Sequence, residues 1–308
     1  MFYIIGGANI DLYCKSDKEL IMKDSNPCQM SFNLGGVARN IAVNLSNLDE
    51  DISFITAFGK DSFGDELIDD FKRRDIDLSF SVRSYEYPSS IFMAVLNKED
   101  MVLGMNDLSV LKEINEEVID NLSNVVSDDD YLFLDTNFDS KLIEYILDNV
   151  KGIKVCDAIS ANKVTKLEGL TGKLDIFKMN LLEAEKLSGR KLFNDNEIVK
   201  YIKELIEQGT KEIIISGKDY IYVGKKDDIC KYTHDAYIKN PVNTTGAGDA
   251  LLAYYVYGRK QGLDIDDASK IGIAASVLTV CEELPVVETD INKVVEKANS
   301  IKIEKETY

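Results

Sequence analysis

The residues best placed for chemistry form the stretch from Gly246 to Asp249, directly before an uncharged run from Ala250 to Gly258. The run is apolar on every side, so it predicts a buried helix with an acid in its first turn. Small residues at a helix start let unpaired backbone N–H groups and the helix dipole hold an anion. Repulsion makes an aspartate a poor ligand there, but it suits a base that deprotonates a hydroxyl attacking a phosphoryl group. We therefore expect phosphoryl transfer to an alcohol, with Asp249 kept ionised near neutrality by the helix dipole.

An alternative needs no chemistry: Thr244 or Thr245 caps the helix, and Asp249 is a first-turn acid favoured by the dipole. The longer stretch from Asn243 is more specific. It closely resembles the signature D-T-x-G-A-G-D of the PfkB (ribokinase-like) carbohydrate kinases, with Asn243 in place of the first Asp. That resemblance implies an ATP-dependent phosphotransferase in which Asp249 is the catalytic base. The backbone amides that it implies at the transferred group are those of Gly246, Ala247 and Gly248.

Two N-terminal motifs resemble the sugar-binding signatures of the same family: G-G-x-x-x-N from Gly35 to Asn40, and G-x-x-x-x-D ending at Asp11. The family's Asp accepts hydrogen bonds from sugar hydroxyls, which suits an acceptor-only carboxylate able to hold two of them. Plain turns explain the same spacing without function, and dinucleotide-binding and P-loop patterns are absent. The substrate-binding residues that the resemblance implies are Asn9, Asp11, Gly35, Gly36 and Asn40, joined by Asn106 and Asp107 for an acceptor with a base.

Asn180 and Glu183 open a predicted helix after a strand that ends at Met179, which places both side chains on one face. A capping box explains this spacing without function. In the family, however, N-x-x-E organises Mg²⁺ and the phosphates of ATP, often through water. The nucleotide-binding residues that the resemblance implies are Lys178, Asn180, Ser216, Gly217, Thr245 and Ala275, with Asn180 and Glu183 at the metal. Members of the family often also bind a monovalent cation such as K⁺ near the C-terminal signature. The match of Gly59 to Gly64 to the family's G-x-D-x-x-G predicts mainly a turn capped by Asp61.

Composition narrows the classes of partner. At 308 residues the chain can bury a large core, and its formal charge of −18, from 54 acids and 36 bases, argues against nucleic acid and anionic membranes. Five cysteines without C-x-x-C spacing fit a reducing compartment. The single histidine, His234, argues against a His-based zinc site or a Ser-His-Asp triad, and we interpret it as a surface-loop residue. With no signal peptide and no membrane span in the sequence, we expect a cytoplasmic protein.

Short apolar strands alternate with helical spacing for most of the chain, which predicts a parallel sheet covered by helices on both faces. The expected strands are Phe2 to Gly6, Ile52 to Phe58, Tyr131 to Leu134, Ile153 to Cys156, Ile176 to Met179 and Ile213 to Ile215. The expected helices are Val37 to Leu48, Phe63 to Arg74, Ser140 to Asn149, Leu181 to Ser188 and Glu197 to Gln208. The charged end from Ile301 to Tyr308 is expected to fray.

Leu12 to Asn33 and Asp77 to Met105 break this alternation with short strand-like pieces. They predict a small antiparallel lid, built from about 12–33 and 77–105, that lies beside the main sheet and over a cleft. The family resemblance implies a single kinase domain over 1–308 with an α/β fold, the ribokinase-like three-layer αβα sandwich with a mainly parallel central sheet. A homodimer through the lid is a further expectation.

Three local strings look most like the pseudouridine kinases within this family: Gly35 to Ala42 with Asn44 and Leu45, Met105 to Asp107, and Cys156 to Lys163 leading to Lys178 to Asn180. A C-nucleoside acceptor would place its ribose at Asp11 and Asn40 and its uracil edge at Asn106 and Asp107. An acceptor of the ribokinase or fructokinase type stays open, and so does a non-catalytic regulator that binds a sugar or nucleoside. The retained acid with its intact Gly-Ala-Gly argues against the regulator.

Overall fold

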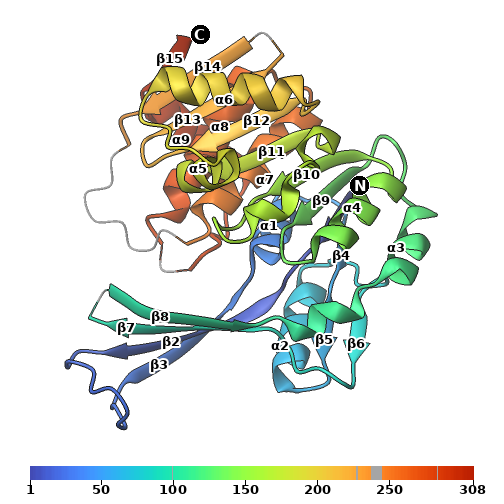
Figure 1. Cartoon of the computed structure of the whole chain (residues 1–308), viewed down its shortest axis with the longest axis vertical. Coiled ribbons are helices and arrows are strands. Elements are labelled where there is room, and N and C mark those ends of the chain that lie inside the picture. Colours follow the sequence, from blue (N-terminus) through green and yellow to red (C-terminus); the bar gives the residue numbers. More distant parts are fainter. Residues whose placement is uncertain (99, 227, 237–244, 283) are drawn as a thin grey trace.

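The computed structural model describes residues 1–98, 100–226, 228–236, 245–282 and 284–308, and within these its centre is a nine-stranded sheet (Figure 1). In spatial order, the parallel strands are β4 (Ile52–Ile55), β1 (Phe2–Ile5), β9 (Tyr131–Asp135), β10 (Ile153–Asp157), β11 (Ile176–Asn180) and β12 (Glu212–Ser216). The antiparallel strands β13 (Tyr220–Lys225), β14 (Asp228–His234) and β15 (Ile303–Thr307) extend it at one edge. The predicted mainly parallel central sheet is confirmed.

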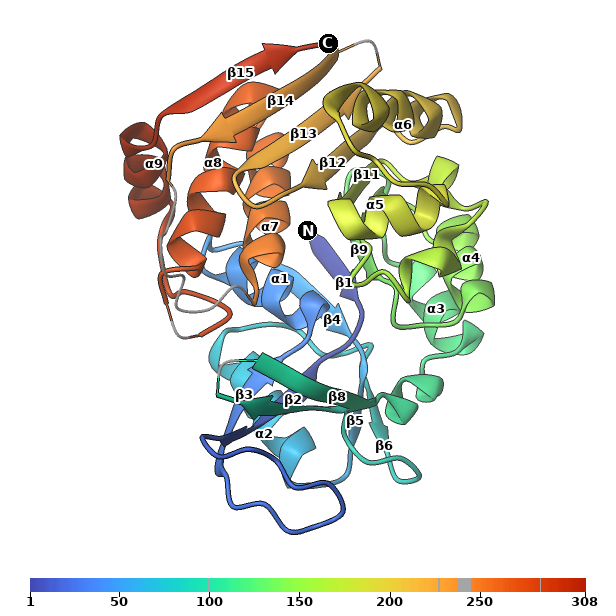
Figure 2. The same cartoon turned by 60° about the vertical axis from the view of Figure 1, so that its left-hand side comes forward.

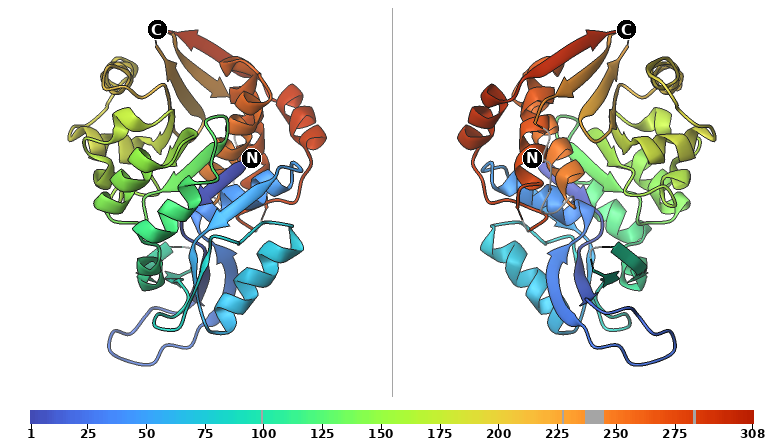
Figure 3. Two further views of the ribbon diagram at one scale, coloured as in Figure 1. Left: turned by 90° about the vertical axis from the view of Figure 1, so that its right-hand side faces the viewer. Right: turned by 90° about the vertical axis from the view of Figure 1, so that its left-hand side faces the viewer.

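Helices cover both faces of this sheet, which makes a three-layer αβα sandwich (Figure 2 and Figure 3). One face carries α1 (Val37–Ser46), α7 (Ala247–Lys260), α8 (Ile265–Thr279) and α9 (Ile291–Ser300). The other face carries α3 (Glu116–Ser123), α4 (Ser140–Asn149), α5 (Leu181–Ser188) and α6 (Asp195–Glu207), with the short 3-10 helices η1 (Ser109–Glu113), η2 (Val164–Leu167) and η3 (Thr171–Lys173) between elements.

The parallel strands are buried on both faces because their side chains alternate between two hydrophobic cores. In β1, Ile4 packs into the core on the side of α1 and α7, whereas Ile5 packs into the core on the side of α4 and α6. Strands of this kind read as continuous apolar runs, which is why they were predictable. Helix α7 lies between α1 and α8, and its Tyr254 and Tyr255 are fully buried.

The predicted strand from Ile52 to Phe58 is two strands. β4 stays in the large sheet, but β5 (Ala57–Gly59) turns away and pairs with β6 (Val82–Ser84). Helix α2 (Ser62–Arg73) follows, and the carboxylate of Asp61 accepts a hydrogen bond from the Gly64 N–H at 2.8 Å. The predicted cap at Asp61 is therefore confirmed.

A second sheet of four strands projects from this body in the described part of the chain (Figure 1). We call it the small sheet, and its order is β3 (Gln29–Gly35), β2 (Asn9–Ser16), β7 (Ile91–Asn97) and β8 (Asp100–Asp107). It is mixed and not antiparallel as predicted, because β2 pairs with β7 in parallel. Its bounds also differ from 12–33 and 77–105: Asp77 bridges Ser53 in the body, and the small sheet reaches inward to Asn9.

The C-terminal segment does not fray. β15 pairs with β14, whose outer edge would otherwise leave its backbone groups unpaired, and the backbone N–H of Tyr308 donates to Ile229. Lys305 of β15 also forms an ion pair with Asp266 of α8. Within the described ranges no helix is both long enough and apolar enough to cross a membrane.

Candidate active site

The acid at the start of α7 meets a motif from the other end of the chain. Gly246 precedes the helix in the left-handed conformation, at φ 82°, and Asp249 lies in the first turn with 6% of its surface exposed. Its Oδ2 accepts a hydrogen bond of 2.8 Å from the side-chain amide of Asn40 in α1. The Asn40 Oδ1 is buried and has no partner within the described residues. The N-terminal and C-terminal motifs therefore form one site, with a free amide oxygen beside the acid.

Burial controls the protonation of Asp249. It raises the pKa of the carboxyl to about 7, and the nearby charge of Asp157 adds to this effect. Lys178 and the hydrogen bond from Asn40 act in the opposite direction. The expectation that the helix dipole keeps this acid ionised near neutrality is therefore wrong. Loss of water around the buried carboxylate disfavours its charged form, so its ionisation near neutrality is incomplete.

A buried ion pair lies against the start of α7. The Lys178 ammonium in β11 donates to Asp157 Oδ2 in the neighbouring strand β10 at 2.8 Å, and both side chains are less than 10% exposed. A Cβ atom on Gly248 would come within 2.6 Å of the Lys178 Nζ. Any side chain at this position would displace the ammonium from its place beside the helix start. Burial lowers the pKa of Lys178, but the carboxylates of Asp157, Glu183 and Asp249 outweigh it and hold the pKa above its ordinary value.

Asn180 and Glu183 form the capping box that their spacing predicts. Asn180 Oδ1 accepts from the Glu183 N–H at 2.9 Å, and Glu183 Oε2 accepts from the Asn180 N–H at 2.7 Å. Glu183 is nevertheless buried, with its pKa raised by desolvation and by the charge of Asp157. The described residues contain no group of three or more His, Cys, Asp or Glu side chains arranged to hold a metal. The capping role of these two residues is thus established. A role in binding a cation would rest on the negative charge of Glu183 and its neighbours Asp157 and Asp249.

The two glycines of the N-terminal motif are required by their surroundings. A Cβ on Gly35 would overlap the carboxylate of Asp11, and a Cβ on Gly36 would overlap the carbonyl oxygen of Gly7. Gly36 also has φ 103°, a conformation that other residues rarely adopt. Asn9 donates its side-chain amide to Asp11 Oδ1, and burial raises the pKa of Asp11 to about 6 against the lowering effect of that bond. The glycine turn therefore packs against the buried carboxyl of Asp11.

Sequence reasoning missed a buried acid that supports this turn. Asp135, at the end of β9, accepts from the Gly7 N–H at 2.7 Å and from the Asn137 side-chain amide at 2.8 Å. Lys163 in turn donates to Asn137 Oδ1 at 2.6 Å. Burial raises the pKa of Asp135. The available signal was an acid directly after an apolar strand, because the carboxyl ends of parallel strands meet at one edge.

A cavity of about 250 Å³ opens beside the start of α7. Its wall includes Ala247 and Gly248 from that helix and Ser216 and Gly217 from the end of β12, as the sequence predicts for a nucleotide pocket. The apolar part of the wall comes mainly from α7, α8 and the residue after α8: Leu251, Ile273, Val277 and Val280, with Ser276 beside them. The remaining wall is formed by Lys218, Asp219, Tyr220, Ile221, His234 and Ala236. A small apolar slot that ends at a helix start suits a flat base joined to phosphates.

Two predictions around this cavity are wrong. Ala275 is 3% exposed and packs into the core, whereas its neighbour Ser276 lines the cavity, because successive helical residues point in different directions. His234 is not a surface-loop residue. It ends β14 on the cavity wall, and burial lowers its pKa, so the imidazole is neutral at pH 7. Strand β14 was not predicted, which explains the error.

The remaining predicted residues are spread over two regions. Asn106 and Asp107 both lie on β8, but successive strand residues face opposite sides, and Asp107 accepts from the Ser109 N–H at 2.9 Å. Thr245 is an exposed turn residue directly before Gly246. Asn243 and Thr244 lie outside the described residues.

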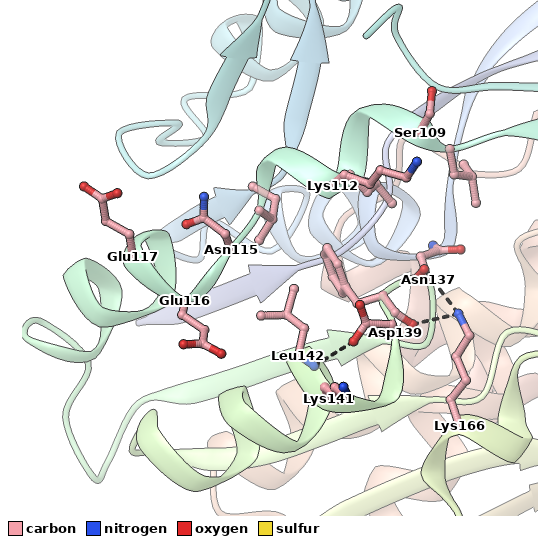
Figure 4. A pocket seen from close by; sticks show the side chains of 14 residues that line it. Ser109, Lys112, Asn115, Glu116, Glu117, Asn137, Asp139, Lys141, Leu142 and Lys166 are labelled. Carbon is pink, nitrogen blue, oxygen red and sulfur yellow. Dashed lines mark hydrogen bonds between the residues drawn. The ribbon is translucent and has the colours of Figure 1, made fainter. Parts of the chain in front are cut away.

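A larger hollow, of about 880 Å³, lies between η1, the start of α3 and the start of α4 (Figure 4). Figure 4 shows Lys166 directed at the turn after β9, where its ammonium donates to the carbonyls of Thr136 and Phe138 at 2.9 and 2.7 Å. Neither Asp249 nor the glycines of the two motifs line it, and it approaches the site only through Asn137. The bonds of Lys166 to this turn therefore give it a structural role.

Comparison with known proteins agrees with this geometry. Residues 2–289 match the family described as pfkB family carbohydrate kinase. The chain is 31% identical over 254 residues to the pseudouridine kinase of Escherichia coli (strain K12), covering 81% of this chain and 80% of that protein. It is 27% identical over 291 residues to the ribokinase of Staphylococcus aureus (strain COL), covering 90% and 92%. The solved structure of Arabidopsis thaliana ribokinase complexed with ribose and ATP is similar in fold, with a TM-score of 0.81 at 17% identity, covering 96% and 98%.

Proposed function

The chain belongs to the pfkB family of carbohydrate kinases, and we propose that it transfers the γ-phosphate of ATP to the primary hydroxyl of a nucleoside or sugar, with pseudouridine as the preferred acceptor. Family membership makes the protein a phosphotransferase. The observation that best supports the finer proposal is the hydrogen bond between Asn40 and Asp249. It joins the predicted acceptor motif to the helix that also lines the nucleotide cavity.

Asp249 is the proposed general base. With a pKa of about 7, a large share of the carboxyl is ionised at neutral pH and has nearly the basicity that makes proton transfer effective. It takes the proton of the acceptor hydroxyl as that oxygen attacks the γ-phosphate. Asn40 holds the carboxylate through one oxygen, which leaves the other for the hydroxyl.

The start of α7 is the proposed cradle for the transferred group. The amides of Gly246, Ala247 and Gly248 stand at the positive end of the helix dipole, before its internal hydrogen bonds begin. The Lys178 ammonium approaches Gly248 from β11 and adds a full positive charge to these partial ones. Fixed donors aimed at developing charge are the largest contribution that such a site makes to the rate.

Asp157 and Glu183 are the side chains that fit a Mg²⁺ ion arriving with the nucleotide. Both are buried, and the positive charge of Lys178 faces three carboxylates, counting Asp249. A divalent cation with oxygen ligands balances such a cluster, and Mg²⁺ commonly keeps several waters. Asn180 bonds both oxygens of Glu183 and therefore orients the carboxylate. When bound, such an ion would neutralise part of the negative charge of the ATP phosphates.

Pseudouridine is proposed as the acceptor because the relative from Escherichia coli (strain K12) with that name reaches 31% identity over most of both chains. A coupled ADP-release assay over pseudouridine, uridine, ribose, fructose and adenosine tests the choice. The expected result is the highest kcat/KM with pseudouridine. A higher kcat/KM with ribose or fructose would instead support a sugar kinase, the alternative that the similarity to ribokinase favours. If no acceptor led to ADP release, the kinase proposal would fail and the non-catalytic binding protein would remain.

We also propose a homodimer through the small sheet. One of its faces carries exposed apolar side chains from the outer strands: Met30, Phe32, Leu103 and Met105. An apolar face of this kind on a soluble chain is typical of an interface. Sedimentation of the wild type against Phe32→Glu tests it, with a dimer that becomes a monomer as the expected result.

A further inference from the structure

One row of side chains crosses all four strands of the small sheet on the face of Asp11. Asp11 of β2 pairs with Asn33 of β3 on one side and with Phe92 of β7 on the other, and Phe92 pairs with Asn106 of β8. Residues in register share a face of the sheet. Three strand spacings of about 4.8 Å make the row about 14 Å long, enough for a sugar and a base side by side.

The Phe92 ring is not used by the core of the protein. Phe92 is half-buried, yet it belongs to neither hydrophobic core formed by the described residues. A Cβ on Gly104 would lie 3.3 Å from the Phe92 Cε2 and 3.5 Å from its Cζ. The ring therefore leans across to β8 and covers a position with no side chain. An aromatic ring beside a buried acid, packed over glycine, has one surface left for a ligand.

The other face of the small sheet has a different character. Residues adjacent to the row along each strand point there, and on each strand at least one of them is apolar, as with Leu12, Met93 and Met105. Phe32 also lies on that face, in register with Leu12, and is 54% exposed. The small sheet thus carries two exposed or half-exposed phenylalanines, one on each face, and only Phe92 shares a face with Asp11.

We propose that the row recognises a nucleoside: Asp11 binds the ribose hydroxyls, the Phe92 ring is the platform on which the base stacks, and the Asn106 amide binds the edge of the base. An aromatic side chain stacks on any base, and a carboxamide both donates and accepts, which matches the adjacent N–H and C=O groups of a uracil. A free pentose would contact Asp11 but would leave the Phe92 ring exposed to water. This inference rests on the proposed function and names the specificity-determining residue within it.

Kinetics of three variants test the platform. Phe92→Leu keeps an apolar side chain but removes the ring, Phe92→Tyr keeps the ring, and Phe32→Leu is the matched control on the opposite face. We expect Phe92→Leu to raise the KM for pseudouridine about tenfold, the order that stacking on one base supplies, while the KM values for ribose and ATP change little. Phe92→Tyr and Phe32→Leu should stay within about twofold of the wild type, because both leave the stacking contact in place.

Equal effects of Phe92→Leu on ribose and pseudouridine, or none on pseudouridine, would overturn the proposal. Calorimetric titration with pseudouridine separates this outcome from a failure of the proposed function. If the wild type releases no ADP but binds pseudouridine, and Phe92→Leu weakens that binding, the phosphotransfer proposal fails and the platform stands. A wild type that binds ribose but no nucleoside overturns the platform alone.

Discussion

Replacing Asp249 by asparagine tests the assignment of the catalytic base. The variant keeps the size of the side chain and an oxygen that accepts the 2.8 Å bond from Asn40, but it removes the proton acceptor. General-base catalysis contributes about 10² to 10⁴ in rate, so kcat should fall at least about 100-fold. The KM for ATP should change little, because the cavity wall contains Ala247 and Gly248 but not Asp249.

The same carboxyl predicts a pH dependence with a definite sign. In the folded protein its pKa is about 7, and an unfolded aspartate has a pKa of about 3.9. Because the folded pKa is the higher one, the folded state retains the proton longer, and the stability from this group is lost as pH rises from about 4 through about 7. Wild-type kcat/KM should rise with pH up to about 7, as the base ionises. Asp249→Asn should raise the Tm more at pH 8 than at pH 5.

Steady-state ADP release and thermal unfolding at pH 5 and pH 8 measure both effects. Asp267→Asn is the matched control, since it removes an exposed first-turn acid from the neighbouring helix α8 and should leave kcat unchanged. A kcat of Asp249→Asn within tenfold of the wild type would end the base assignment. An equal Tm change at both pH values would show that the carboxyl is not protonated by burial.

Three further predictions concern other parts of the chain. Asp11→Asn should raise the acceptor KM at least about tenfold, the loss of a hydrogen bond to a charged group, and leave the KM for ATP unchanged. Gly36→Ala should lower stability by about 1 to 3 kcal/mol in thermal unfolding, more than Gly169→Ala, because only Gly36 combines positive φ with a backbone clash at Gly7. Glu212→Gln, at the amino-terminal end of β12 and away from the proposed site, should lower the Tm by weakening its bonds to Arg259 while kcat stays constant.

Local pattern was enough for strands that are buried on both faces and for helices with one apolar face. The helices from Ser140 to Asn149 and from Leu181 to Ser188 have the predicted bounds, and the strands around Val155 and Ile214 lie where the apolar runs predict them. Local sequence pattern did not predict the strands at the outer edge of the large sheet. β15 is charged and looks like a frayed end, but β14 offers it a complete set of backbone partners. Such pairing depends on a strand far away in sequence.

The candidate site shows the same division. Asp11, Asn40 and Asp249 stand in motifs with fixed spacing, so the family resemblance was sufficient to name them. Asp135 stands in no such motif, and Asp157 lies in the Cys156–Lys163 string without a role that the resemblance assigns to it. The pairing of β1 with β9 brings Asp135 beside Gly7, and the pairing of β10 with β11 brings Asp157 beside Lys178. Which side chain of a helix lines a cavity is likewise a matter of rotation, and this distinguishes Ser276 from Ala275.

By itself, the sequence determined the layered α/β fold, the family and the acid that can act as a base, because apolar periodicity and motif spacing are local properties of the chain. Tertiary structure decided how that acid behaves. The pKa of Asp249 follows from water lost on burial and from charges on β10, β11 and α5, none of which adjoins it in sequence. Electrostatic energy depends on distances through space and on the surrounding medium, and those exist only once the chain has folded.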